Sequence, residues 1–192
     1  MNKSKTVRGN GPWFTIASVA VLTLVLPRAL LYGPDAVLLR DGLFLELLLA
    51  LSASDLRSRT LPDALILQGI VLWGLWLFAE GLSGSGEFLR HLASDGLAAI
   101  LYAGAALVLS LLSDRIFRKE TLGGGDVKML FMVMLYLGFA RGFLCLVIAL
   151  LTGLIFLAVS KAKRIPWGPS VAAGAASALL FGDQALKLLK LF

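Results

Sequence analysis

The sequence predicts an all-α fold, a polytopic bundle of about six or seven transmembrane helices. Hydrophobic residues make up 58% of the 192 residues and charged residues only 16%, and the mean hydropathy is +0.87. A chain this short cannot hide such an apolar excess in one soluble core. The apolar residues also form continuous runs instead of alternating, which favours helices over a barrel. The composition therefore argues against a soluble globular protein and against a disordered one.

Up to residue 112, the chain contains four of the expected spans, at about residues 13–32, 43–53, 61–79 and 97–112. The first follows basic residues and so also resembles a signal peptide. The second can begin near Ala36 and carries Glu46 inside its apolar run. Pro62 and Asp63 are a helix-start signal for the third. The fourth follows a glycine-rich loop and an amphipathic lead-in at 87–91.

The rest of the chain contains the remaining three, at about residues 126–140, 142–160 and 169–181. The fifth span opens at Asp126, and Arg141 is expected in a tight turn before the sixth. The seventh is rich in Ala and Gly, which suits close helix packing. No linker or repeat divides the chain, so we expect one domain over 1–192, with its motifs in a core of about 43–181.

The basic residues predict the orientation of the bundle. If the N-terminus is cytoplasmic and the first span is retained, about two thirds of the 18 Lys and Arg residues fall on the cytoplasmic side. Lys187 and Lys190 do not, if the seventh span is real. The net charge of +6 is then explained by cytoplasmic loops, without nucleic acid as a partner.

Two segments place acidic residues where a polar loop meets an apolar helix. Segment 55–63 (DLRSRTLPD) follows the second span, and segment 122–128 (LGGGDVK) opens the fifth. Ionisable groups at membrane depth are costly and tend to mark function. Asp55 and Asp126 both fall on the cytoplasmic side of the predicted topology, so they can meet across the bundle.

Two carboxylates that meet cannot both ionise cheaply and tend to share a proton. One can then take a proton from water while the other donates one to a peptide carbonyl, as in aspartic proteases. Glycines 123–125 would give a peptide close access to the backbone. Each acid also has a simpler interpretation, with Asp126 as a helix N-terminal residue and Asp55 paired with Arg57 or Arg59.

The motifs together resemble the type IV prepilin peptidases. Segment 55–63 is similar to the first catalytic motif of that family, Gly123–Lys128 to its GxGD motif, and Arg164–Pro169 (RIPWGP) to a third element before the last helix. Leu61 and Trp167 replace the commoner Ile and Phe. The resemblance covers about 43–181 and implies an intramembrane-type aspartic peptidase that cuts prepilins or pseudopilins on the cytoplasmic side of the inner membrane.

The resemblance also implies site residues. Asp55 and Asp126 correspond to the catalytic pair. The residues expected to shape the site or bind substrate are Gly123, Gly124, Gly125, Lys128, Arg57, Pro62, Asp63, Pro166, Trp167 and Pro169. Long members of the family carry paired CxxC motifs linked to N-methylation. This chain has one Cys and one His, so we expect a peptidase without methyltransferase activity, metal or cofactor.

Other functions fit parts of the pattern. A related peptidase could cut the leader of a peptide that is not a pilin, and nothing in the sequence separates the two. A small proton- or cation-coupled transporter could use intramembrane acids, but it predicts acids spread across the bilayer, whereas Asp55 and Asp126 lie on one side. An inactive structural subunit predicts the loss of one of the two acids, and both are present.

Overall fold

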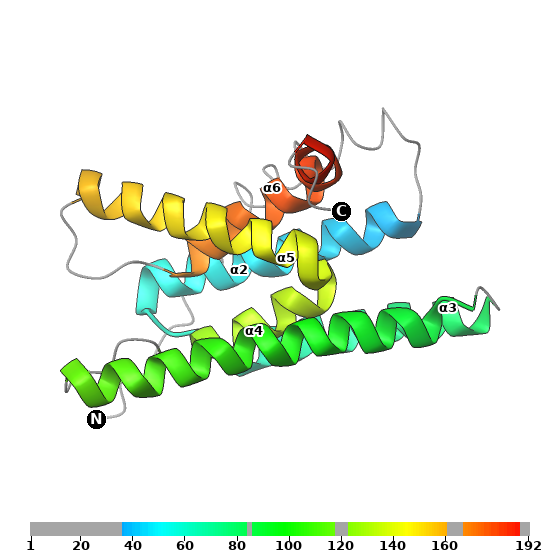
Figure 1. Ribbon diagram of the computed structural model, residues 1–192, viewed down its shortest axis with the longest axis horizontal. Coiled ribbons are helices and arrows are strands. Elements are labelled where there is room, and N and C mark those ends of the chain that lie inside the picture. Colours follow the sequence, from blue (N-terminus) through cyan, green and yellow to red (C-terminus); the bar gives the residue numbers. More distant parts are fainter. Residues whose placement is uncertain (1–35, 84–85, 118–122, 161–166, 189–192) are drawn as a thin grey trace, which may run out of the picture.

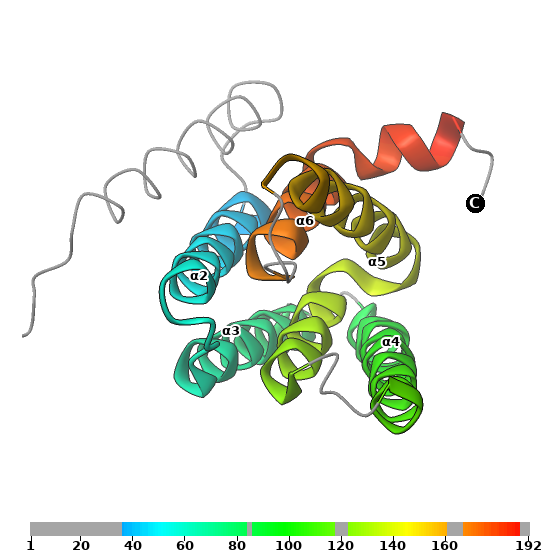
Figure 2. The ribbon, with the colours of Figure 1, turned by 90° about the vertical axis from the view of Figure 1, so that its left-hand side faces the viewer.

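The structure is a computed structural model that describes residues 36–83, 86–117, 123–160 and 167–188. These residues form five helices: α2 (Ala36–Ser58), α3 (Asp63–Leu82), α4 (Phe88–Phe117), α5 (Gly124–Ser160) and α6 (Trp167–Leu188). The helices pack side by side as a bundle (Figures 1 and 2). The described part of the chain contains no strand, which confirms the all-α prediction. The first expected span, 13–32, lies outside the described residues.

Three of the described helices, α3, α4 and α5, are long and apolar enough to cross a membrane. Many of their large apolar side chains are exposed, as on surfaces that contact lipid, including Leu75, Phe78, Leu109 and Leu154. Helix α4 is longer than the sequence predicts, because the lead-in at 87–91 and the expected span at 97–112 form one continuous helix. The total of six or seven spans and the cytoplasmic N-terminus remain predictions.

Helix α5 is broken at Gly138, where the backbone adopts φ 63° and ψ −163°. The chain reverses its direction there, so α5 consists of a first limb (124–137) and a second limb (139–160) (Figure 1). Glycine adopts a positive φ without the penalty that a side chain imposes. A Cβ at this position would also lie 3.0 Å from Oδ1 of Asp95. The two limbs correspond to the fifth and sixth expected spans, with the break a little earlier than predicted.

The first limb of α5 is the centre of the core. Its buried side chains include Met129, Met132 and Val133, and they pack on a buried face of α2 that contains Phe44 and Leu48. Phe44 also stacks on the ring of Tyr136 at 4.0 Å between centroids. The Tyr136 hydroxyl donates to the carbonyl of Gly69 in α3 at 3.0 Å. These contacts fix the first limb of α5 against α2 and α3.

The second limb of α5 packs closely on α6. The expected small-residue face of α6 is buried, with Ala172, Ala175 and Ala178 in the core. A Cβ on Gly174 would collide with the backbone carbonyl oxygen of Cys145. Cys145 is itself buried and its Sγ lies 3.8 Å from the carbonyl of Val171, consistent with the packing role expected for it.

We therefore expect Gly174→Ala to lower stability by about 1–3 kcal/mol, because neither backbone can yield without moving its helix. Thermal unfolding of the purified protein in detergent measures the change. Gly104→Ala in α4 is the matched control, since a Cβ there meets nothing within 4 Å. It should leave stability unchanged or raise it by up to about 1 kcal/mol. An equal effect of the two substitutions would contradict the close packing.

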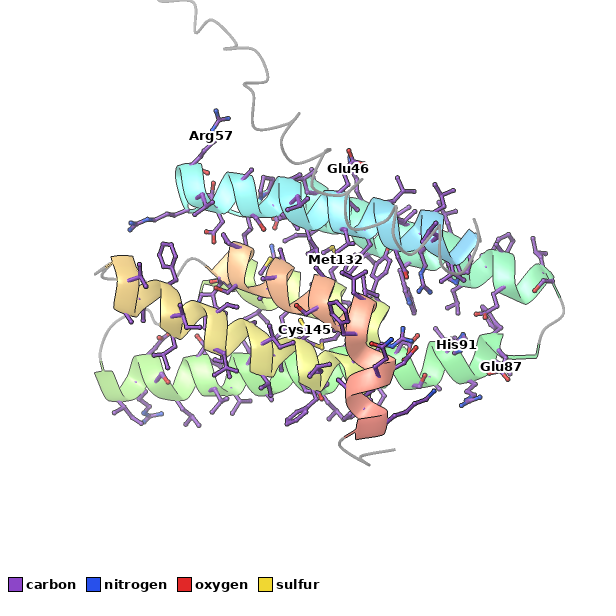
Figure 3. The ribbon with its side chains drawn as sticks, turned by 90° about the horizontal axis from the view of Figure 1, so that it is seen from above. Glu46, Arg57, Glu87, His91, Met132 and Cys145 are labelled. Carbon is purple, nitrogen blue, oxygen red and sulfur yellow. The ribbon has the colours of Figure 1, made fainter. Side chains whose placement is uncertain are left out.

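Polar contacts join α2, α3 and α4 at one end of the bundle. Arg40 pairs with the buried Asp41 at 2.8 Å and lies over the ring of Trp76 in α3. His91 of α4 lies 2.8 Å from the Glu80 carboxylate of α3. Figure 3 shows His91 at the opposite end of the bundle from Arg57. The motif-bearing segments lie at the Arg57 end.

Candidate active site

Three segments that are distant in sequence meet at the Arg57 end of the bundle: the last turn of α2, the first turn of α5 and the first turn of α6 (Figure 1). Asp55 lies in the last turn of α2 and contacts the start of α6. Asp126 is the third residue of α5. The loop between α2 and α3 closes the site from one side, because Leu61 packs against Gly125.

Asp55 is held by the first turn of α6. Its carboxylate is 9% exposed, and Oδ2 accepts a hydrogen bond of 2.8 Å from the backbone N–H of Gly168. The first N–H groups of a helix have no partner within the helix and carry a partial positive charge. The side chain of Asp55 therefore caps the N-terminus of α6. The contact needs a glycine, since a Cβ at 168 would lie 2.9 Å from Cβ of Asp55.

Asp126 is held by the glycine run that precedes it. Its Oδ2 accepts a hydrogen bond of 3.2 Å from the backbone N–H of Gly123, while its own N–H donates to the Gly123 carbonyl at 3.0 Å. An acidic side chain at the third helical position often reaches back in this way to the residue before the helix. The interpretation of Asp126 as an N-terminal helix residue is thus correct, and it is compatible with a role in the site.

The side chains of Asp55 and Asp126 lie near enough to interact electrostatically across the site. Each has its Oδ2 bound to a glycine N–H, and Oδ1 of each accepts no hydrogen bond from another described residue. Among the described residues, one oxygen of each carboxylate thus has no hydrogen-bond donor. Two carboxylates in this relation can share a proton and serve as a general acid and a general base. The described residues contain no group of three or more His, Cys, Asp or Glu side chains that could hold a metal ion.

The conformation of the loop after α2 is fixed by a residue with left-handed backbone geometry and by the hydrogen bonds of two serines. Arg59 has φ 53° and donates its N–H to the Asp55 carbonyl at 2.9 Å, which ends the helix. Ser54 Oγ donates to the Thr60 carbonyl at 2.9 Å, and the Ser58 and Thr60 hydroxyls lie 2.6 Å apart. The predicted pairing of Asp55 with Arg57 or Arg59 is not present among the ion pairs of the described residues. These contacts bring Leu61 to the glycine run.

The three glycines of the run are not equivalent. A Cβ at Gly123 would lie 3.3 Å from Oδ2 of Asp126, and one at Gly125 would lie 3.3 Å from Cβ of Leu61. A Cβ at Gly124 meets nothing within 4 Å. The first and third glycines thus lie tightly against neighbouring side chains, whereas the middle one has room for a side chain.

Lys128 pairs with Asp63 and not with Asp126. Its Nζ lies 2.9 and 3.0 Å from the two carboxylate oxygens of Asp63, across the gap between α5 and α3. The sequence had left open whether Lys128 contacts substrate, lipid headgroups or Asp126. Both partners are exposed, at 58% for Lys128 and 71% for Asp63. The pair ties the start of α3 to the start of α5 beside the site.

We expect this ion pair to matter little for activity, because exposed pairs contribute about 0.2–1 kcal/mol. Lys128→Met should lower the rate of peptide cleavage by no more than a few fold, and the Lys128→Met/Asp63→Asn variant should be no slower than either single variant. Initial rates at low and high salt measure this. A loss as large as that of an Asp126 variant would show instead that Lys128 acts directly on the reacting groups.

Most of the other expected site residues lie at the starts of helices. Pro62 is the N-cap of α3, as the helix-start signal predicts, and its carbonyl accepts the Leu65 N–H at 3.1 Å. Trp167 and Pro169 flank Gly168 in the first turn of α6 and are partly buried. Arg57 is exposed and points away from the bundle (Figure 3). Pro166 lies outside the described residues.

The sequence missed Gly168, although it stands in the third motif between two residues that were singled out. Its signal was a glycine within a Trp-Gly-Pro helix start, where a free N–H and no side chain are available. Nothing in the sequence pointed to Asp55 as the acceptor, 113 residues away in the chain.

Comparison with known proteins adds independent information. Residues 42–158 match the type IV leader peptidase family. Two curated proteins of Burkholderia pseudomallei, from strains 1026b and K96243, are 30% identical over 187 residues, and both are described as prepilin leader peptidase/N-methyltransferase. The match covers 93% of this chain and 58% of each relative, so the chain spans less than two thirds of their length. No solved structure gives a significant match.

Proposed function

Because this chain belongs to the type IV leader peptidase family, we propose that it is a membrane aspartic endopeptidase that removes the basic leader of prepilin or pseudopilin-like proteins. The family match and the three membrane-length helices make it an integral membrane protein. The printed description of the two relatives supports the prepilin peptidase role. The observation that supports the mechanism is the proximity of two carboxylates. Asp55 is bound to the first turn of α6, and Asp126 lies in the first turn of α5.

In the proposed reaction, one carboxylate is ionised and the other carries a proton. The ionised carboxylate takes a proton from water, and the water oxygen attacks the carbonyl carbon of the scissile peptide bond. The protonated carboxylate donates its proton to the carbonyl oxygen. The C–N bond then breaks, the leaving amine takes up a proton, and the leader departs with a new carboxyl terminus. Such a pair needs no metal ion and forms no covalent intermediate.

The site is proposed to face the cytoplasm, with the chain in the prokaryotic inner membrane. The support is the charge distribution, which places the ends that carry Asp55 and Asp126 on the side of the basic loops. We propose peptidase activity alone for this chain. Its single cysteine, Cys145, is buried in the core and so cannot supply the paired CxxC motifs linked to methylation in long members of the family.

Co-expression with a prepilin tests the proposal. The wild-type chain should shorten the prepilin by its leader, visible as a gel shift and as a mass change that corresponds to hydrolysis at one bond. Cleavage should persist in the presence of a metal chelator and of serine and cysteine protease reagents. No shift with several prepilins, despite good expression in the membrane, would point to a leader peptidase for another peptide or to a transporter. Inhibition by the chelator would contradict the proposed chemistry.

A further inference from the structure

An apolar groove of about 570 Å³ opens beside the candidate site, between α3, α4 and the first limb of α5. One face of α3 from Asp63 to Ile70 forms one wall, and Val127, Lys128 and Phe131 form the other. Ala103, the lining residue from α4, is buried and contributes to the floor. A volume of this size is typical of a binding site. Its lining is apolar apart from the Asp63–Lys128 ion pair.

The groove lies beside the site, within one helical turn of Asp126 along α5. Val127 and Lys128 directly follow Asp126, and Asp63 ends the segment that begins at Asp55. A peptide held at the Asp126 carboxylate therefore has the groove close by, on the neighbouring face of α5. A lipid chain could also enter an apolar groove in the membrane, but its position next to Asp126 would have no explanation.

The charges at the groove indicate which part of the substrate it binds, the basic leader or the apolar segment. The Asp63–Lys128 pair is neutral as a whole, so a basic leader finds no net negative charge there. The remaining wall, including Leu67 at 60% exposure, offers only apolar contact. From Asp63 to Ile70 the wall runs about 10 Å along α3, which matches roughly two turns of a helix. These features fit a short apolar stretch and not a charged one.

We propose that this groove binds the apolar segment that follows the scissile bond of the substrate. The inference rests on the proposed function, and it specifies the docking face that the peptidase uses. The substrate would then cross the site with its basic leader on the loop side of Asp55 and Asp126 and its apolar segment against α3 and the first limb of α5.

Filling the groove with a bulky side chain tests the proposal through KM and kcat for peptide cleavage. The probe is a synthetic peptide with a lysine-rich leader, a glycine before the scissile bond and an apolar helix, in vesicles of phosphatidylethanolamine and phosphatidylglycerol. Ala64→Trp, at an exposed position of the wall, should raise KM about 10-fold or more and change kcat little, because it removes binding and not chemistry. Ala79→Trp, also exposed on α3 but outside the groove, should leave both unchanged. Unchanged KM in Ala64→Trp would overturn the proposal.

Disulfide cross-linking gives a second measurement that does not need activity. Leu67→Cys in an Asp126→Asn background should cross-link to a cysteine placed in the apolar segment of the same peptide, and Leu75→Cys, exposed elsewhere on α3, should not. The buried Cys145 should not compete. Equal cross-linking at 67 and 75, or cross-linking of 67 to the leader, would overturn the docking face. Failure of the proposed function is distinguishable, because then the wild-type chain cleaves none of these peptides.

Discussion

Asp55→Asn and Asp126→Asn are each expected to abolish leader removal, with rates at least about 10²–10⁴-fold below wild type. Asparagine keeps the size of the side chain and can still accept the N–H of Gly168 or Gly123. It cannot take or deliver the proton that the hydrolysis requires. Each carboxylate has a separate proton to move, so neither substitution can be rescued by the remaining acid.

The measurement is the initial rate of cleavage of one prepilin by purified protein in detergent or vesicles, with membrane yield and thermal unfolding as folding controls. Glu46→Gln is the matched control, because Glu46 is an exposed acid on the same helix as Asp55 and points away from the bundle (Figure 3). It should retain the wild-type rate. Substantial cleavage by either aspartate variant would show that the chemistry lies elsewhere.

Gly168→Ala is expected to lower cleavage about 100-fold while the protein still folds. The added Cβ would lie 2.9 Å from Cβ and 3.0 Å from Oδ2 of Asp55, and 3.2 Å from the backbone Cα of Ser52. Because Ser52 and Asp55 both belong to α2, either that helix or the start of α6 must shift. A displacement of about 1 Å at reacting groups can cost about 100-fold in rate.

Gly124→Ala is the control for a methyl group added to a glycine of the motifs. A Cβ there meets nothing within 4 Å, so both cleavage and stability should stay near wild type. The comparison requires kcat and KM for the two variants together with the unfolding temperature. If Gly168→Ala cleaves at the wild-type rate, the hydrogen bond from Gly168 to Asp55 is not what positions the carboxylate.

Much of the fold could be predicted because a continuous hydrophobic run indicates a helix. The start of α3 after Pro62 and the start of α5 just before Asp126 follow from local signals at helix ends. The break in α5 was expected near 140–142, and it lies at Gly138, whose backbone has a positive φ. The long α4 was not expected, since its polar first turns look like a separate lead-in when the ion pairs to α3 are unknown.

The sequence singles out the acids and glycines of the candidate site but not the contacts that they make. Asp55 and Asp126 stand out because charge at membrane depth is costly. Three features join residues that are far apart in the chain. They are the hydrogen bond from Gly168 to Asp55, the Lys128–Asp63 ion pair and the groove beside Val127. Only the packing of α2, α3, α5 and α6 brings them together. The buried Asp41 was missed for the same reason, since its burial depends on the partners around α2.

The most direct test of the central claim compares four proteins in one cleavage assay: wild type, Asp55→Asn, Asp126→Asn and the double variant. Groups that act as a unit give strongly non-additive losses. We therefore predict that the two single variants and the double variant lose cleavage to the same extent, within a few fold, at equal amounts of folded protein. A single variant that keeps a rate close to wild type, or a double variant slower than both by the product of their separate losses, would contradict a shared Asp55/Asp126 site.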